Sequence, residues 1–102
     1  MTDRELLEAA AKAAGVTFVP WKDCLGGWNE PEDLWNPLTD DGDALRLAVR
    51  LNLSIDIQGD LVEVILPPDY GYISIKEVFS TDPYAATRRA IVMAAAEIGK
   101  TL

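Results

Sequence analysis

The sequence contains no histidine and only one cysteine, Cys24, among its 102 residues. Histidine is the commonest general base and the usual zinc ligand, and Ser-His and Cys-His nucleophile pairs all require it. Cys24 has no second cysteine for an internal disulfide, and the neighbouring Leu25-Gly26-Gly27 offers no base to activate its thiol. These absences exclude most hydrolase mechanisms and suit a reducing compartment. We therefore expect a non-enzymatic protein with no cofactor and no metal site.

Basic residues and long apolar runs are also scarce. Nine Lys and Arg face seventeen Asp and Glu, so the formal net charge is -8. Nucleic acid and anionic membranes recruit clusters of basic residues, and a membrane span requires roughly 18 apolar residues in a row. The acidic N-terminus, with Asp3 and Glu5, also lacks the basic character of a secretory signal. We expect no direct nucleic-acid binding, no membrane association, a cytoplasmic location and partners that are basic.

The length and the apolar fraction predict a single folded domain over residues 1–102. Apolar residues make up 49% of the chain, which is enough to offset the entropy of folding despite the charge. A chain of this length has room for one hydrophobic core and not for two. The composition leaves open whether the protein is a monomer or a small homo-oligomer.

Two helices are predicted in the first half of the chain from their end signals. Thr2 followed by Glu5 forms a capping box, and Gly15 supplies the stop of this first helix. Either Thr39 or Asp40 caps the second helix. The apolar stripe of the second helix is expected to comprise Leu45, Ala48, Val49 and Leu51, widened by Leu47.

The second half of the chain reads as a meander of strands followed by a third helix. Apolar and polar residues alternate over 53–58, Gly59-Asp60 makes a hairpin turn, and the returning strand covers 61–66. A further strand is expected over 72–79. Asp82-Pro83 then opens a helix, because proline is favoured at the first helical position. The inner stripe of that helix is expected to comprise Tyr84, Ile91, Ala94, Ala95 and Ile98.

The segment between the first and second helices is less regular. Residues 16–19 are β-branched and aromatic and predict a short strand. Residues 21–40 show no sustained period, so this stretch is either functional or hides a short strand around Trp28 or Leu34-Trp35. The predicted order is α-β-α-β-β-β-α, an α+β fold with three helices and a mainly antiparallel sheet of three to four strands.

The densest charge lies at residues 30–43, where six acids occur without a base. The acids are Glu30, Glu32, Asp33, Asp40, Asp41 and Asp43. Three hypotheses account for them: a cation site loosely similar to a calcium loop, carboxylates that stabilise the start of a helix, and an acidic surface that binds a basic partner. The calcium hypothesis is weakened because the ligand spacing and the distal Glu are missing.

Three tryptophans accompany these acids, at positions 21, 28 and 35. We favour buried anchors that tie the segment to the sheet over exposed contacts for a partner, although a mixture of the two is open. If the acidic surface binds a partner, its expected contact residues are Glu30, Glu32, Asp33, Asp41 and an exposed Trp28. Arg88-Arg89 on the last helix is interpreted as a solvent-exposed pair that partly neutralises the surplus acids.

Two runs of the sequence are similar to a known family. They are WNPLTDDGDALRLA at residues 35–48 and DPYAATRRAIV at residues 82–92, and the first helix, ELLEAA at residues 5–10, matches as well. Together they resemble small bacteriophage and prophage proteins that contain the phage ABA sandwich domain. The resemblance covers most of the chain and implies an α/β/α-type sandwich, but it carries no catalytic residue.

This resemblance implies a function by analogy with small acidic phage proteins that block host machinery. The expected function is a phage-encoded, non-enzymatic protein that inhibits a host defence complex, as an anti-CRISPR or another anti-defence inhibitor, through its acidic surface. The partner would be a host protein complex with a basic surface in the bacterial cytoplasm. The alternative is a phage accessory or virion-associated interaction protein without inhibitory activity.

Overall fold

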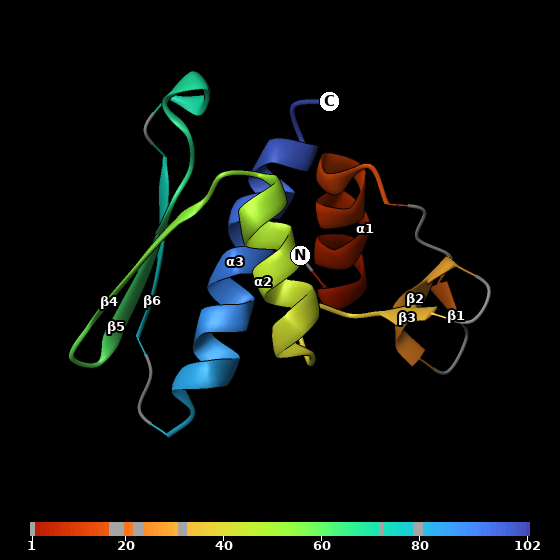
Figure 1. The fold of residues 1–102 in the computed structure, drawn as a ribbon, viewed down its shortest axis with the longest axis horizontal. Coiled ribbons are helices and arrows are strands. Elements are labelled where there is room, and N and C mark those ends of the chain that lie inside the picture. The colour runs from red at the N-terminus through yellow and green to blue at the C-terminus, as the bar shows by residue number, and fades with distance from the viewer. Residues whose placement is uncertain (1, 17–19, 22–23, 31–32, 72, 79–80) are drawn as a thin grey trace.

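The computed structural model describes residues 2–16, 20–21, 24–30, 33–71, 73–78 and 81–102, and between 20 and 34 it describes the backbone alone (Figure 1). It confirms the predicted α+β class, with three helices and a three-stranded antiparallel sheet in the expected order. The elements are α1 (Asp3–Ala14), β1 (Pro20–Trp21), β2 (Cys24–Glu30), β3 (Asp33–Trp35), α2 (Asp41–Arg50), β4 (Ser54–Gln58), β5 (Leu61–Ile65), the 3-10 helix η1 (Pro68–Tyr70), β6 (Ser74–Val78) and α3 (Pro83–Gly99).

The helix ends follow the predicted local signals. Thr2 and Glu5 form the capping box of α1, and Gly15 ends that helix in the left-handed conformation, with a φ of 72°. Of the two candidates for the second cap, Asp40 is the one used, since its carboxylate accepts a hydrogen bond from the Asp43 backbone N–H. Asp82 caps α3, with Pro83 in the first turn. Each cap satisfies backbone N–H groups that have no partner within the helix.

Strands β4, β5 and β6 form the predicted meander. Gly59, with a φ of 59°, makes the tight turn between β4 and β5, and the pairing runs without a register shift. Val62 and Val64 of β5 are fully buried, and their neighbours across the sheet are Ile57 and Ile55 of β4. These four residues share one side of the sheet, which we call the helix side because α3 packs on β5 and β6. The opposite side is called the outer side.

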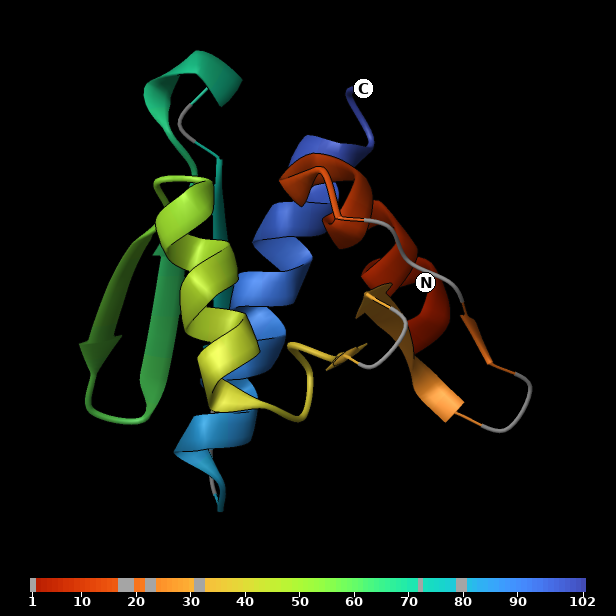
Figure 2. The same ribbon diagram turned by 45° about the vertical axis from the view of Figure 1, so that its right-hand side comes forward.

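The core lies between the three helices and the helix side of this sheet. Alanines dominate the facing sides of α1 and α3, where Ala10, Ala14, Ala90, Ala94 and Ala95 are buried. Small side chains let the two helix axes approach closely, and the α1–α3 contact is the most extensive between any two elements. The sequence did not determine whether helices cover one or both sides of the sheet. In the described part of the chain, they lie on one side, as the two views agree (Figure 1, Figure 2).

Residues 20–35 are more regular than the sequence indicated. The stretch interpreted as irregular contains β1, β2 and β3, which form a second antiparallel sheet beside α1, away from the first sheet (Figure 1). The hidden strand expected around Trp28 or Leu34-Trp35 is therefore present twice, as β2 and β3. The strand predicted over 16–19 falls mostly on residues 17–19, which lie outside the described residues.

Two predicted apolar stripes were partly wrong. In α2, Leu45 and Val49 are 59% and 69% exposed, and the buried side is formed by Ala44, Leu47 and Ala48. In α3, Ile91 and its neighbours are buried as predicted, whereas Tyr84 is exposed. The helical period identifies apolar residues but not which of them a neighbouring element covers: Leu45 and Val49 line a cavity beside Trp35, and Tyr84 lies in the exposed first turn of α3.

Of the helices in the described part of the chain, none combines the length and the apolar composition needed to cross a membrane.

Candidate protein-interaction surface

The predicted contact residues do not all fall on one described surface. Trp28 and Glu30 lie in β2 and Asp33 lies in β3, where Glu30 and Asp33 are paired across the two strands. The side chains of these three residues are outside the described part, as is the whole of Glu32. Asp41 is fully described and is the first residue of α2. Of the predicted contact residues, the structure therefore describes the side-chain surroundings of Asp41 alone.

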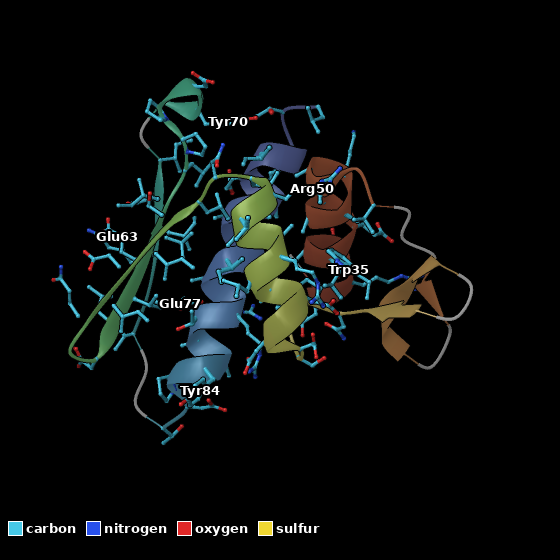
Figure 3. All side chains as sticks on the ribbon, in the orientation of Figure 1. Trp35, Arg50, Glu63, Tyr70, Glu77 and Tyr84 are labelled. Carbon is cyan, nitrogen blue, oxygen red and sulfur yellow. The ribbon has the colours of Figure 1, made fainter. Side chains whose placement is uncertain are left out.

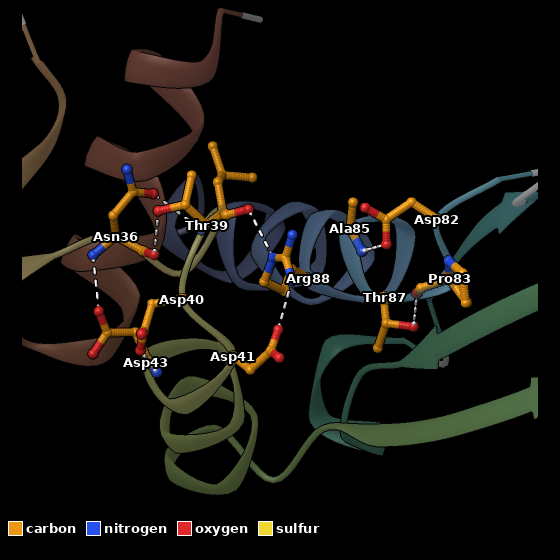
Figure 4. Close-up of polar contacts among 11 residues, drawn as sticks. Asn36, Thr39, Asp40, Asp41, Asp43, Asp82, Pro83, Ala85, Thr87 and Arg88 are labelled. Atoms are coloured by element: carbon orange, nitrogen blue, oxygen red, sulfur yellow. Dashed lines mark hydrogen bonds and ion pairs between the residues drawn. The ribbon is translucent and has the colours of Figure 1, made fainter.

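The acids at the start of α2 form a local network. Asp40 accepts a hydrogen bond of 2.8 Å from the backbone N–H of Asp43, and Asp43 accepts one of 3.0 Å from the backbone N–H of Asn36 (Figure 4). Arg46, one turn later, donates to the Asp43 carboxylate over 2.7 Å and lies 3.8 Å from that of Asp40. The hydrogen bond to Asp43 is the main reason why the pKa of Arg46 is raised above its ordinary value. Asp40 and Asp43 therefore fix the start of the helix.

Asp41 is held by a residue far away in the sequence. The Arg88 guanidinium of α3 forms an ion pair with the Asp41 carboxylate at 2.6 Å and donates a second hydrogen bond to the Leu38 carbonyl oxygen at 2.9 Å (Figure 4). The Arg88 side chain is 18% exposed, so this arginine is more buried than the sequence interpretation expected. Its neighbour Arg89 pairs with Asp3 and Glu77, as expected for a residue that neutralises surplus acids. Of the three hypotheses for the acidic segment, the described acids fit the structural one.

The remaining negative charge is located elsewhere, on the β4–β6 sheet. Most described carboxylates either cap a helix or form an ion pair with a described cation. Within the described residues, the exceptions all lie between Ser54 and Tyr70. They are Asp56, Asp60, Glu63 and Asp69, and we call them the unpaired carboxylates.

Two unpaired carboxylates are directly opposite each other on the outer side of the sheet. The register pairs Asp56 of β4 with Glu63 of β5, and Glu63 with Lys76 of β6. Figure 3 shows Glu63 on the outer side, whereas Glu77 points toward α3. Asp56 accepts a hydrogen bond of 2.7 Å from the Gln58 side-chain amide, which is neutral. Like charges directly across two strands are unfavourable, so this position favours an additional cation.

The helix side of β4 is apolar and incompletely covered. Ile55 and Ile57 are 37% and 60% exposed, although their neighbours across the sheet, Val64 and Val62, are fully buried. The difference arises because α3 packs on β5 and β6 and does not extend to β4. The alternation over 53–58 predicted a half-buried strand. Ile55 and Ile57 do lie on the helix side of the sheet, but they are more exposed than that prediction implies.

A cavity of about 570 Å³ lies between the end of α1, Trp35 and α2. Its polar groups are Asp43, Arg46 and Arg50, and the first two already bind each other. The rest of its lining is apolar and comprises Ala14, Val16, Trp35, Leu45, Leu47 and Val49. Trp35 is buried, as the anchor interpretation predicted for it. The cavity borders β1–β3, whose side chains are described only for Trp35.

No group of three or more Asp, Glu or Cys side chains in the described part of the chain is arranged to hold a metal ion. The three acids nearest one another, at the start of α2, are instead occupied by backbone N–H groups and arginines.

Comparisons with protein-family models, with curated protein sequences and with solved structures found no match to this chain. The similarity to phage ABA sandwich proteins therefore stays a prediction, and the function is argued from the residues themselves.

The sheet was not predicted as a candidate surface, although the sequence contains a signal for it. Residues 51–75 contain four acids and no Lys or Arg. The number of acids per residue is highest at 30–43, and this stretch was therefore predicted as the surface. The local number of acids does not show which of them form ion pairs with residues from elsewhere in the chain. Arg88 is 47 residues from Asp41, and only the fold brings them together.

Proposed function

We propose that this protein is a non-enzymatic binding protein and that its partner is a protein with a basic surface. The non-enzymatic part rests on the sequence, which has no histidine and a single cysteine in a context that does not activate it. The choice of partner rests on charge, because a chain of net charge -8 attracts basic surfaces and repels nucleic acid and anionic lipid.

The observation that carries the proposal is the position of the unpaired carboxylates. Asp56, Asp60, Glu63 and Asp69 form no ion pair with a described cation; Asp56 and Glu63 lie side by side on β4 and β5, Asp60 lies in the turn between these strands, and Asp69 lies in η1 at the other end of the sheet. Uncompensated charges on one surface steer a partner of opposite charge and raise the rate of association. The start of α2 does not offer the same potential, because its acids are held by Arg46 and Arg88.

The narrower form of the proposal is that the partner belongs to a host defence complex and that binding inhibits it. This form derives from the similarity to phage proteins described above, and the same acidic surface would serve it. Trp28, Glu30 and Asp33 of the second sheet stay proposed contacts, as does Glu32, which lies outside the described residues, whereas Asp41 is a weaker candidate because binding would have to compete with Arg88.

The test begins with affinity purification of the tagged protein from bacterial cells that carry the relevant defence system or phage. Surface plasmon resonance over a salt series then follows association with the recovered partner. We expect association to slow steeply as salt rises, while dissociation changes little, because salt screens long-range attraction. Association that is independent of salt would contradict the proposal.

Two sets of charge reversals locate the surface in the same experiment. One set changes Asp60, Glu63 and Asp69 to Lys, and the other changes Glu30, Glu32 and Asp33 to Lys. The two variants have the same net charge, so a difference between them reports position and not total charge. We expect the first set to slow association more. Equal slowing by both sets would mean that only the net charge of the protein matters.

A further inference from the structure

Strand β4 is an unprotected edge of the first sheet. In the described part of the chain it pairs with β5 alone, and its other edge has no strand beside it. Proteins usually protect such edges with a lysine, a proline, a bulge or a covering helix. Residues 54–58 contain no lysine and no proline, and their pairing with β5 has no register shift. The free backbone groups of β4 are thus available to another strand.

The other edge of the same sheet provides the contrast. β6 carries Lys76 in its centre, and α3 packs along it. Glu77 of β6 also forms an ion pair of 3.6 Å with Arg89 of α3. The β6 edge therefore carries the usual protecting lysine at its centre, whereas the only charge on β4 is Asp56, which repels acidic strands and attracts basic ones.

The two sides of β4 differ in chemistry. On the helix side, Ile55 and Ile57 are exposed beside buried valines, so an added strand with apolar residues there would extend the core. On the outer side, Asp56 lies next to Glu63 with only the Gln58 amide as a neutral partner. A Lys or Arg placed opposite Asp56 would lie directly beside that carboxylate and about two strand spacings, roughly 10 Å, from Glu63, which has Lys76 as its neighbour on the far side.

We propose that the free edge of β4 binds an extended segment of the partner protein in which apolar and basic residues alternate. Main-chain hydrogen bonds would join the segment to β4, its apolar side chains would cover Ile55 and Ile57, and its basic side chains would face Asp56 and Glu63. This inference rests on the proposed function and deepens it, because it names the strand and the kind of peptide that the acidic surface recognises.

Charge argues against a second copy of the chain as the occupant. Strand β4 and its turn carry Asp56 and Asp60 and no base, so pairing β4 with itself would bring acids of two chains of net charge -8 together. A basic segment gains from the same charges. We therefore assign the edge to a different protein.

The test uses a fluorescent peptide of about eight residues, the length of a typical strand, in which Lys and Val alternate. NMR of the labelled full-length protein follows the backbone amides during titration, and fluorescence anisotropy gives the affinity. We expect saturable shifts in Ser54–Gln58 and smaller ones in β6. A matched peptide of alternating Glu and Val should not bind. Shifts centred on any other element, or no saturable binding, would overturn the inference.

Two pairs of variants separate the edge from general charge attraction. Asp56→Lys should weaken peptide binding about tenfold, whereas Glu8→Lys on α1, with the same change in net charge, should change it less than about twofold. Ile57→Ser should weaken binding several-fold, whereas Val78→Ser, at an equally exposed β-branched residue on β6, should not. All four positions are at least partly exposed, and the NMR spectrum of each variant verifies its fold.

The outcomes distinguish this inference from the proposed function. If Glu8→Lys weakens binding as much as Asp56→Lys does, the acidic protein still attracts basic peptides but the β4 edge is not their site. If binding is insensitive to salt, the proposed function fails as well. Sedimentation equilibrium of the protein alone completes the set: a dimer that Ile57→Ser dissociates would place a second copy on β4 and overturn the inference.

Discussion

Gly99 in the last turn of α3 lies directly against the backbone of Ala9 in α1, so closely that a methyl group on Gly99 would overlap the Ala9 carbonyl group. The contact lies at one end of the alanine-rich interface between α1 and α3. Backbone can approach backbone here because neither residue presents a large side chain. The spacing of the two central helices therefore depends on a position where only glycine fits.

Replacing Gly99 with alanine should destabilise the protein by about 1 to 3 kcal/mol, the usual cost of overpacking a tight interface. The direction of this change in stability is informative, because alanine otherwise stabilises a helix interior relative to glycine by roughly 0.5 to 1 kcal/mol. Urea denaturation measures the free energy of unfolding. The comparison is Gly42→Ala in α2, where a methyl group would lie 3.2 Å from the Arg46 guanidinium and the Asp40 carboxylate, side chains that would have to shift slightly, and not against backbone. That variant should lose less stability than Gly99→Ala, and equal stability of the two variants would contradict the packing seen here.

Trp35 should be required for stability. Its side chain is 7% exposed at the end of β3, and it belongs to the hydrophobic core. Trp35→Ala should cost about 3 to 5 kcal/mol, as for other large buried aromatic residues. Thermal melting or urea denaturation tests this expectation. Tyr84→Ala is the control, since Tyr84 is 70% exposed and its loss should change stability by less than about 0.5 kcal/mol. A Trp35→Ala protein as stable as the control would place the ring on the surface.

Arg88 and Asp41 should contribute unequally to the free energy of unfolding, although they form an ion pair with each other. Arg88→Ala removes the donor of the Leu38 carbonyl as well as the ion pair, and should cost about 1 to 3 kcal/mol because a partly buried acceptor loses its partner. Asp41→Asn removes only a charge on a largely exposed side chain and should cost less than about 1 kcal/mol. Denaturation of the two single variants and the double variant yields the coupling energy. The reverse order of effects would mean that the ion pair, and not the carbonyl, is what Arg88 stabilises.

The capping box of α1 should make stability depend on pH in the acid range. The Thr2 backbone N–H and hydroxyl both donate to the Glu5 carboxylate, and they lower its pKa below the ordinary value of 4.5. A carboxylate with a lowered pKa stabilises the folded state above its unfolded pKa, and this contribution is lost as the pH falls through the folded pKa. The melting temperature of the parent should therefore exceed that of Glu5→Ala near pH 7 by a constant amount, and the difference should shrink below about pH 4.5.

Thr2→Val provides the control for this prediction. The variant keeps the Glu5 carboxylate but removes the hydroxyl that donates to it. The difference in melting temperature between the single variant Thr2→Val and the double variant Thr2→Val/Glu5→Ala should therefore depend less on pH than the difference between the parent and Glu5→Ala. An equal dependence in both backgrounds would mean that the Thr2 hydroxyl does not affect the Glu5 pKa. The effect is expected to be small, because Glu5 is exposed to solvent.

The sequence by itself determined the features that depend on neighbours within about four residues. The helix starts at Thr2 and Asp82 were predicted, and the second was narrowed to Thr39 or Asp40, because a capping side chain binds an N–H three residues along the chain. The β4–β5 hairpin was predicted because alternation and a Gly-Asp turn are local signals. Element order and fold class followed from these local elements.

The tertiary structure alone decided which surfaces remain available for binding. Leu45 and Val49 looked like core residues, yet the buried side of α2 is formed by Ala44, Leu47 and Ala48, because the position of the neighbouring elements decides which side is covered. Asp41 looked like a free acid, but Arg88 of α3 forms an ion pair with it, whereas Asp56 and Glu63 form no ion pair with a described cation, although Lys76 is the cross-strand neighbour of Glu63. Burial and neutralisation depend on residues that are distant in the sequence, and a local pattern carries no information about them.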